Sequence, residues 1–137
     1  MTQNYLSTDY QSFIHKSRYA RWLDEEGRRE NWSETVSRYI TNIVKPNIDD
    51  FTAKDIEESI LSLQVMPSMR SMMTAGPAAD RDNTCMYNCS YLPIDDPKSF
   101  DEAMFILLCG TGVGFSVERQ FISKLPEVPE LFDSDTT

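Results

Sequence analysis

Residues 86–119, MYNCSYLPIDDPKSFDEAMFILLCGTGVGFSVER, decide the fold class that the sequence predicts. Residues 86–94 have the composition of a short strand. Residues 100–108 place apolar side chains at helical spacing, and Gly110 suits the end of that helix. A second strand is expected at residues 115–119. A strand, a helix and a strand in this order predict a βαβ unit with two parallel strands.

The start of the predicted helix and the small number of strands add two expectations. Asp96 and Pro97 are suited to the N-cap and the first helical position. Parallel strands are normally buried on both faces and need further strands beside them. We therefore expect an α/β fold whose sheet is completed by another polypeptide; a compact α+β domain with a small sheet is the alternative.

The first part of the chain has helical character. Residues 8–26 are expected to form a helix that stops at Gly27. Asn31 and Glu34 have the spacing of a capping box at the start of a second helix. A third helix is expected from Thr52.

Residues 65–77 are apolar, contain two prolines and have no clean period, so an irregular but ordered connection is predicted there. A polar turn is expected at residues 80–83. The predicted organisation is a helical region (residues 1–64), a βαβ part (residues 65–125) and an acidic tail or docking segment (residues 126–137).

Charge and hydropathy exclude several classes of function. The chain of 137 residues has a net charge of −9, and the acidic excess lies after residue 45, so nucleic-acid binding is not expected. No apolar run is long enough to span a membrane, and the first nine residues lack a secretory signal pattern. A cytoplasmic location is predicted.

Cys85, Cys89 and Cys109 are an odd number of cysteines, which favours buried, metal-bound or redox-active thiols over a disulfide scaffold. No metal site is predicted, because zinc would need more ligands than the cysteines and His15 plausibly supply. In one strand, Cys85 and Cys89 would lie about 13 Å apart, so a redox partner from elsewhere is simpler.

The segment Gly110–Gly114 is glycine-rich but is neither a Walker loop nor a dinucleotide fingerprint. It follows a helix and precedes a strand, the reverse of the phosphate-binding order. Two interpretations remain open: a tight helix-to-strand connection, or a place where a ligand approaches bare backbone.

Several blocks of sequence, in order, resemble the start of the monomeric adenosylcobalamin-dependent ribonucleoside-triphosphate reductases over residues 13–128. The blocks are Arg21–Trp22, Arg28–Val36, Val65–Arg70, Thr74–Pro77, Tyr87–Tyr91 and Cys109–Gln120. The resemblance implies the first strands of a ten-stranded α/β barrel. It also implies reduction of ribonucleoside triphosphates to 2′-deoxyribonucleotides by a cobalamin-initiated thiyl radical, with two further cysteines closing to a disulfide.

The resemblance assigns roles by matching motif. Cys89 would be one of the two reducing cysteines, and Ser68 would be the hydroxyl residue that contacts the substrate. Asn88 would border the ribose together with Cys89. Thr111 and Gly112 would touch the substrate through their backbone.

The family's remaining catalytic residues and most of its adenosylcobalamin site lie in later segments. The resemblance therefore implies a component that is inactive alone, as a truncation, a processed fragment or, as we favour, one subunit of a split enzyme. Its partners would be the chains that complete the barrel and an external dithiol such as thioredoxin. The alternative is a non-catalytic nucleotide- or partner-binding module derived from a reductase.

Overall fold

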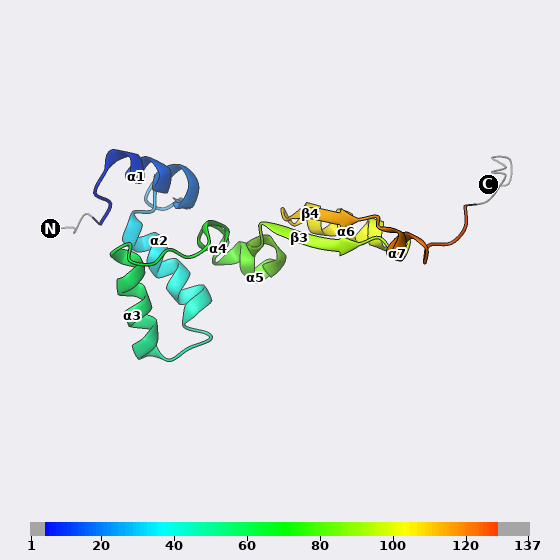
Figure 1. Cartoon of the computed structure of the whole chain (residues 1–137). Helices are drawn as coiled ribbons and strands as arrows, with labels where there is room; N and C mark the ends of the chain where they lie inside the picture. Colours follow the sequence, from blue (N-terminus) through cyan, green and yellow to red (C-terminus); the bar gives the residue numbers. More distant parts are fainter. Residues whose placement is uncertain (1–4, 129–137) are drawn as a thin grey trace. The chain divides into compact units, whose positions relative to one another are not determined.

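The computed structural model describes residues 5–128 and divides the chain into two compact units between Asn88 and Cys89 (Figure 1). Each unit is described by itself. The domain boundaries predicted after residues 64 and 125 stay predictions, and residues 129–137 of the predicted acidic tail lie outside the described residues.

The first unit is mainly helical. α2 packs against α3, and α4 packs against α2. Its elements are α1 (Asp9–Ile14), a π-helical turn (His15–Tyr19), the hairpin strands β1 (Trp22–Leu23) and β2 (Arg28–Arg29), α2 (Trp32–Tyr39), a second π-helical turn (Ile40–Val44), α3 (Asp50–Leu61), α4 (Met69–Thr74), α5 (Pro77–Arg81) and a 3-10 turn (Asn83–Met86).

The predicted capping box of the second helix is confirmed. The Glu34 backbone N–H donates to Asn31 Oδ1 at 2.9 Å, and the Asn31 N–H donates to Glu34 Oε2 at 2.7 Å. α2 then turns one apolar face inward. The buried core around it consists of Leu6, Trp32, Val36, Ile40, Ile60 and Met72.

The prediction of one helix over residues 8–26 is wrong beyond Tyr19, because the chain turns into the β1–β2 hairpin. Its loop, Asp24–Gly27, ends with Gly27 at φ 61°, a conformation that favours glycine. The carbonyl of Ala20 accepts from the Arg29 guanidinium at 2.8 Å. This hydrogen bond, between residues nine positions apart, stabilises the extended backbone at Ala20.

Residues 65–77 are also more regular than predicted. They contain α4 and the start of α5, and each of the two prolines lies at a helix start: Pro67 precedes the N-cap Ser68, and Pro77 is at the first position of α5. Most of the polar turn expected at residues 80–83 is likewise taken up by the end of α5 and the start of the 3-10 turn.

The second unit contains β3 (Cys89–Pro93), α6 (Ser99–Leu108), β4 (Gly112–Ser116) and α7 (Arg119–Ile122). β3 and β4 pair in parallel with Cys89 opposite Gly112, which confirms the predicted βαβ order. α6 ends as predicted. Gly110 has φ 89°, its N–H donates to the carbonyl of Leu107, and the Thr111 N–H donates to that of Ile106.

Several boundaries in this unit differ from the prediction, including the end of the second strand, which lies at Ser116 because Arg119 begins α7. β3 starts at Cys89, because the residues before it form the 3-10 turn. The N-cap of α6 is Lys98, and Asp96 instead accepts from the Lys98 N–H at 2.8 Å in the preceding turn. β4 begins at Gly112 rather than Phe115, so most of the glycine-rich segment is strand.

A buried ion pair holds the elements of the first unit together. The Arg38 guanidinium donates from Nε and Nη2 to the two carboxylate oxygens of Glu30, at 2.7 and 2.9 Å. Nη1 donates to the carbonyls of Met72 and Ala75, both at 2.9 Å, and Nη2 also donates to that of Tyr19 at 3.2 Å. All five N–H donors of an arginine are therefore used.

The carboxylate of Glu30 is satisfied as fully as its partner. Glu30 Oε2 also accepts from the Arg21 N–H at 3.0 Å and from the Thr35 hydroxyl at 2.9 Å. Burial acts to raise the pKa of Glu30, but the hydrogen bonds from Arg38, Arg21 and Thr35 outweigh it, and the pKa is lowered.

We expect Arg38→Met to destabilise the first unit by about 3–5 kcal/mol, because it leaves the Glu30 carboxylate buried without a counter-ion. Both tryptophans, Trp22 and Trp32, lie in this unit, so urea unfolding followed by their fluorescence measures the change. Arg28→Met is the matched control, since Arg28 pairs with Glu26 and Glu34 at the surface and its loss should change the stability much less than loss of Arg38. Equal losses in the two variants would contradict the role given to Arg38.

The stability of this unit should also fall as the pH falls from about 6.5 to about 4. Burial, reinforced by the charge of Lys16, lowers the pKa of His15 from 6.5 to about 4. The unfolded chain then binds a proton in this window before the folded chain does, which stabilises the unfolded state by roughly 2–3 kcal/mol. Urea midpoints across this window should show the loss, and His15→Gln should flatten it.

Candidate active site

Two of the predicted substrate-binding residues line one pocket of the first unit. The pocket has a volume of about 370 Å³ and lies between the start of α4 and the segment around the 3-10 turn. Its walls carry hydroxyl and amide groups and one thioether, without a charged side chain. The lining residues are Ser68, Ser71, Asn83, Met86, Tyr87 and Asn88.

Ser68 occupies the N-cap of α4, yet its hydroxyl forms no capping hydrogen bond. A serine at this position usually accepts from a backbone N–H of the first turn. Here only the Ser68 carbonyl takes part in the helix, accepting from the Met72 N–H at 3.0 Å. The hydroxyl is exposed and is available to a ligand in the pocket.

The side chain of Asn88 is hydrogen-bonded to a residue of α4. Arg70 Nε donates to Asn88 Oδ1 at 3.2 Å, which connects the last residue of the first unit to α4. Because the amide oxygen is engaged, the amide NH₂ of Asn88 is the group left to donate to a ligand.

In the second unit the structure brings Cys89 and Gly112 together. They are directly paired neighbours on β3 and β4, and both are exposed. Paired residues of parallel strands lie on the same face of a sheet, so Tyr91 and Gly114 continue this face. The Cys89 thiol therefore lies next to a strand that has no side chain at the paired position.

Thr111 differs in burial from the other predicted substrate-binding residues. It is buried, with an exposed fraction of 1%, and its N–H donates to the carbonyl of Ile106 at 3.2 Å. This amide is already used to end α6. A backbone contact of Thr111 to a substrate would therefore have to come from its carbonyl, and the predicted contacts of Thr111 and Gly112 stay predictions.

Four residues at this pocket carry no predicted role: Ser71, Asn83 and Tyr87 line it, and Arg70 binds Asn88. Arg70 and Tyr87 lie inside blocks of the family resemblance, so a signal existed for them. Ser71 and Asn83 join the pocket only because α4 and the 3-10 turn form, and neither element was expected.

The other two cysteines lie in different surroundings. Cys85 and Cys109 are half-buried, one in the 3-10 turn and one at the C-cap of α6. Within residues 5–128, which include all three cysteines, no disulfide is formed and no metal-binding cluster of three His, Cys, Asp or Glu side chains occurs.

The fold and the site together define a mixed helix–strand segment that carries an exposed thiol on the first strand of a parallel βαβ unit. Residues 2–77, more than half of the chain, match the family described as the ribonucleotide reductase alpha domain. The chain belongs to this ribonucleotide reductase family.

Relatives with curated names agree with this family. The chain is 29% identical to an adenosylcobalamin-dependent ribonucleoside-triphosphate reductase of Lactobacillus delbrueckii subsp. bulgaricus and 27% identical to that of Lactobacillus helveticus, over 87% of its length in both cases. A crystal structure of a B12-dependent (class II) ribonucleotide reductase matches 89% of the chain with a TM-score of 0.73 and 27% identity. The chain spans about a fifth of these proteins, 21% of each relative and 22% of the solved structure.

None of the helices described between residues 5 and 128 is long and apolar enough to cross a lipid bilayer.

We expect Cys89 to be alkylated faster than Cys85 and Cys109, because its side chain is exposed whereas theirs are half-buried. Limited treatment of the folded chain with iodoacetamide, followed by peptide mass spectrometry, gives the order of modification. Repeating the treatment in urea should remove the difference. Preferential labelling of Cys109 in the folded chain would contradict the exposed position of Cys89.

Proposed function

We propose that this chain is the amino-terminal component of a reductase that converts ribonucleoside triphosphates to 2′-deoxyribonucleotides. It would supply Cys89 as one reducing thiol, and part of the substrate pocket. The observation that carries the proposal is the exposed Cys89 thiol on β3, directly opposite Gly112 of β4. A thiol that reduces a bound ribose must be reachable, and a neighbouring glycine leaves space for the sugar.

The chemistry assigned to Cys89 is a two-electron reduction. The C2′–OH bond breaks, a C2′–H bond forms and the oxygen leaves as water. The hydrogens and electrons come from two thiols, which are oxidised to a disulfide. Cys89 would be one of them, and a cysteine from outside this chain would be the other. An external dithiol such as thioredoxin would then restore both thiols.

The pocket of the first unit supports a role in holding the substrate. The Ser68 hydroxyl and the Asn88 amide are suited to hydroxyl and carbonyl groups of a nucleotide. No lysine or arginine lines the pocket. The triphosphate would therefore need backbone N–H groups or cations from elsewhere to balance its charge.

The surface of the second unit supports completion by further polypeptide. β3 and β4 form a sheet of only two strands, and parallel sheets are normally covered on both faces. Large apolar side chains of α6 and β4 are more than half exposed, which is costly in water. These side chains are Phe100, Met104, Phe105, Leu107, Leu108 and Phe115. We propose that they face the remainder of a ten-stranded barrel.

The named relatives are adenosylcobalamin-dependent, and we propose that this cofactor is bound mainly by polypeptide outside this chain. The pockets described here have volumes of about 300 to 430 Å³, at the lower end of the range for drug-sized ligands, and a corrin ring with its nucleotide arm is much larger. Each of these pockets is therefore too small to enclose the whole cofactor. A cytoplasmic location is part of the same proposal.

Cys89→Ser should abolish multiple turnover when the chain is assembled with the polypeptide that completes the reductase. Deoxynucleotide formation from ribonucleoside triphosphates, with adenosylcobalamin and thioredoxin present, is the measurement. Cys85→Ser is the matched control, since Cys85 lies four residues away in the 3-10 turn and should tolerate the change. Ser68→Ala should raise the substrate KM about threefold to tenfold through loss of one hydrogen bond.

Two results would contradict the proposal. Repeated turnover by Cys89→Ser would remove Cys89 from the mechanism. A wild-type assembly that binds nucleotide but never forms deoxynucleotide would favour a non-catalytic binding module.

A further inference from the structure

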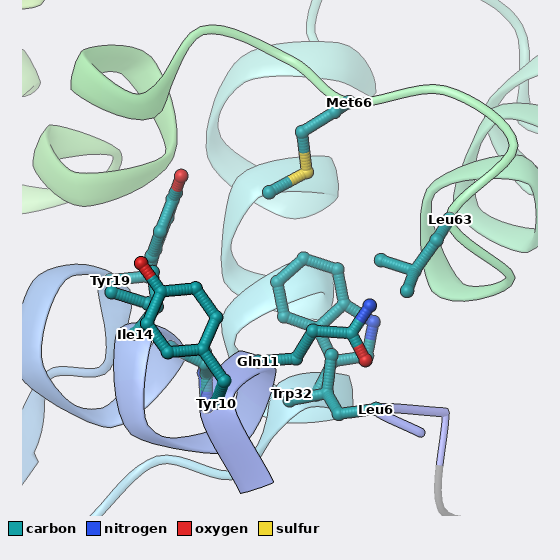
Figure 2. Close-up of a pocket in the computed structure, with 9 residues that line it drawn as sticks. Leu6, Tyr10, Gln11, Ile14, Tyr19, Trp32, Leu63 and Met66 are labelled. Carbon is teal, nitrogen blue, oxygen red and sulfur yellow. The ribbon is translucent and has the colours of Figure 1, made fainter. Parts of the chain in front are cut away.

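A second pocket of the first unit shares no lining residue with the pocket of Ser68 and has no part in the proposed reduction. It has a volume of about 300 Å³ and is enclosed by α1, the π-helical turn after it, the start of α2 and the segment after α3 (Figure 2). Its walls are aromatic or aliphatic except for one carboxamide and one imidazole. The lining residues are Leu6, Tyr10, Gln11, Ile14, His15, Tyr19, Trp32, Leu63 and Met66.

The absence of charge in this lining limits what the pocket can bind. No lysine, arginine, aspartate or glutamate is among its lining residues. A phosphorylated or carboxylated ligand would lose its hydration there without a counter-ion, which is strongly unfavourable. The lining therefore disfavours anionic occupants, and the side chains of Tyr10, Trp32 and Met66 favour an aromatic ring.

Gln11 presents a hydrogen-bond donor of fixed orientation. Its Oε1 accepts from the N–H and hydroxyl of Ser7, at 2.9 and 3.1 Å, and from the Thr8 N–H at 3.1 Å. The bond from Thr8 is one half of the capping box of α1, and all three bonds together fix which end of the carboxamide faces the helix start. The Nε2 group is left over, and in Figure 2 it points towards the side of the pocket formed by Leu63 and Met66.

His15 presents an acceptor. Thr35 has a single hydroxyl hydrogen, and it is donated to Glu30 Oε2 at 2.9 Å. The 2.9 Å bond between Thr35 Oγ1 and His15 Nε2 must then be donated by the imidazole. The neutral ring therefore carries its hydrogen on Nε2, and Nδ1 is left as an acceptor on a side chain that lines the pocket.

Leu63 adds an independent observation. It has φ 63°, and it is the one residue other than glycine with a positive φ among residues 5–128. At the end of a helix this conformation is usually taken by glycine or asparagine, because a branched side chain is strained there. The Leu63 side chain enters the wall of the pocket beside Trp32 (Figure 2), so the strain is accepted at a position that shapes the cavity.

We propose that this pocket binds a small, uncharged aromatic molecule that carries an acceptor and a donor side by side, as an aromatic carboxamide does. The ring occupies the apolar space between Tyr10, Trp32 and Met66. The carbonyl oxygen accepts from Gln11 Nε2, and the ligand N–H donates to His15 Nδ1. The site is independent of the proposed reductase function, since it uses neither Cys89 nor the pocket of Ser68.

Benzamide is a suitable probe, and the two tryptophans give the readout. In the ¹⁵N-labelled full chain, the indole N–H signal of Trp32 should shift saturably with benzamide in the millimolar range. Trp22 lies outside the pocket, so its indole signal, assigned with Trp22→Phe, should not shift with the benzamide concentration. Benzoate, which has the same ring but a negative charge, should bind at least about tenfold more weakly.

Two variants test the assigned contacts. Gln11→Glu keeps the acceptor that caps α1 and removes the N–H donor, so benzamide should bind about fivefold to tenfold more weakly. Gln64→Glu is the matched control, because it adds the same charge in the same unit outside this pocket and should leave binding unchanged. Leu63→Gly suits the positive φ at this position and removes the side chain that forms part of the pocket wall, so it should also weaken benzamide binding.

The proposal is overturned if the Trp32 signal does not shift saturably, or if both tryptophan signals shift together. It is also overturned if benzoate binds as tightly as benzamide, or if neither Gln11→Glu nor Leu63→Gly changes the affinity. None of these measurements depends on reductase activity, so their failure is distinct from failure of the proposed function.

Discussion

The contact between Arg38 and Glu30 is the constraint on which the first unit depends. One guanidinium binds the carboxylate after the hairpin, the end of the first π-helical turn and two carbonyls at the end of α4. A buried charge pair is favourable only when its remaining donors and acceptors are satisfied, and here they are. The consequence reaches the pocket lined by Ser68 and Asn88, because Ser68 is the N-cap of α4 and the same helix holds Asn88 through Arg70.

The second unit depends on a different constraint, which is the pairing of two parallel strands that carry small groups on one face. Cys89 opposite Gly112 produces an exposed thiol with open space beside it. The helix between the strands leaves large apolar side chains in water. The unit thus combines an exposed thiol with an apolar surface that gains stability when covered, and both properties are in keeping with the role proposed above.

Prediction from the sequence succeeded where the signal was local. The capping box of Asn31 and Glu34 needs only four residues, and the stop at Gly110 needs only a glycine in the left-handed region. The order of strand, helix and strand followed from periodicity, and a helix that crosses over between two paired strands makes them parallel. Prediction failed where contacts between residues separated along the sequence determine the local structure. Residues 20–29 became a hairpin because Glu30 and Arg29 bond to backbone across the turn.

The sequence by itself determined the family resemblance, the βαβ order and Cys89 as the candidate thiol, because these are properties of residue type and spacing along the chain. Only the tertiary structure decided that Ser68 and Asn88 share a pocket, that the Thr111 amide is already used, and that His15, Gln11 and Leu63 meet around a second cavity. The physical reason is that pockets and buried hydrogen bonds join residues tens of positions apart. Their partners are selected by packing and by the need to satisfy every buried polar group, which no local pattern specifies.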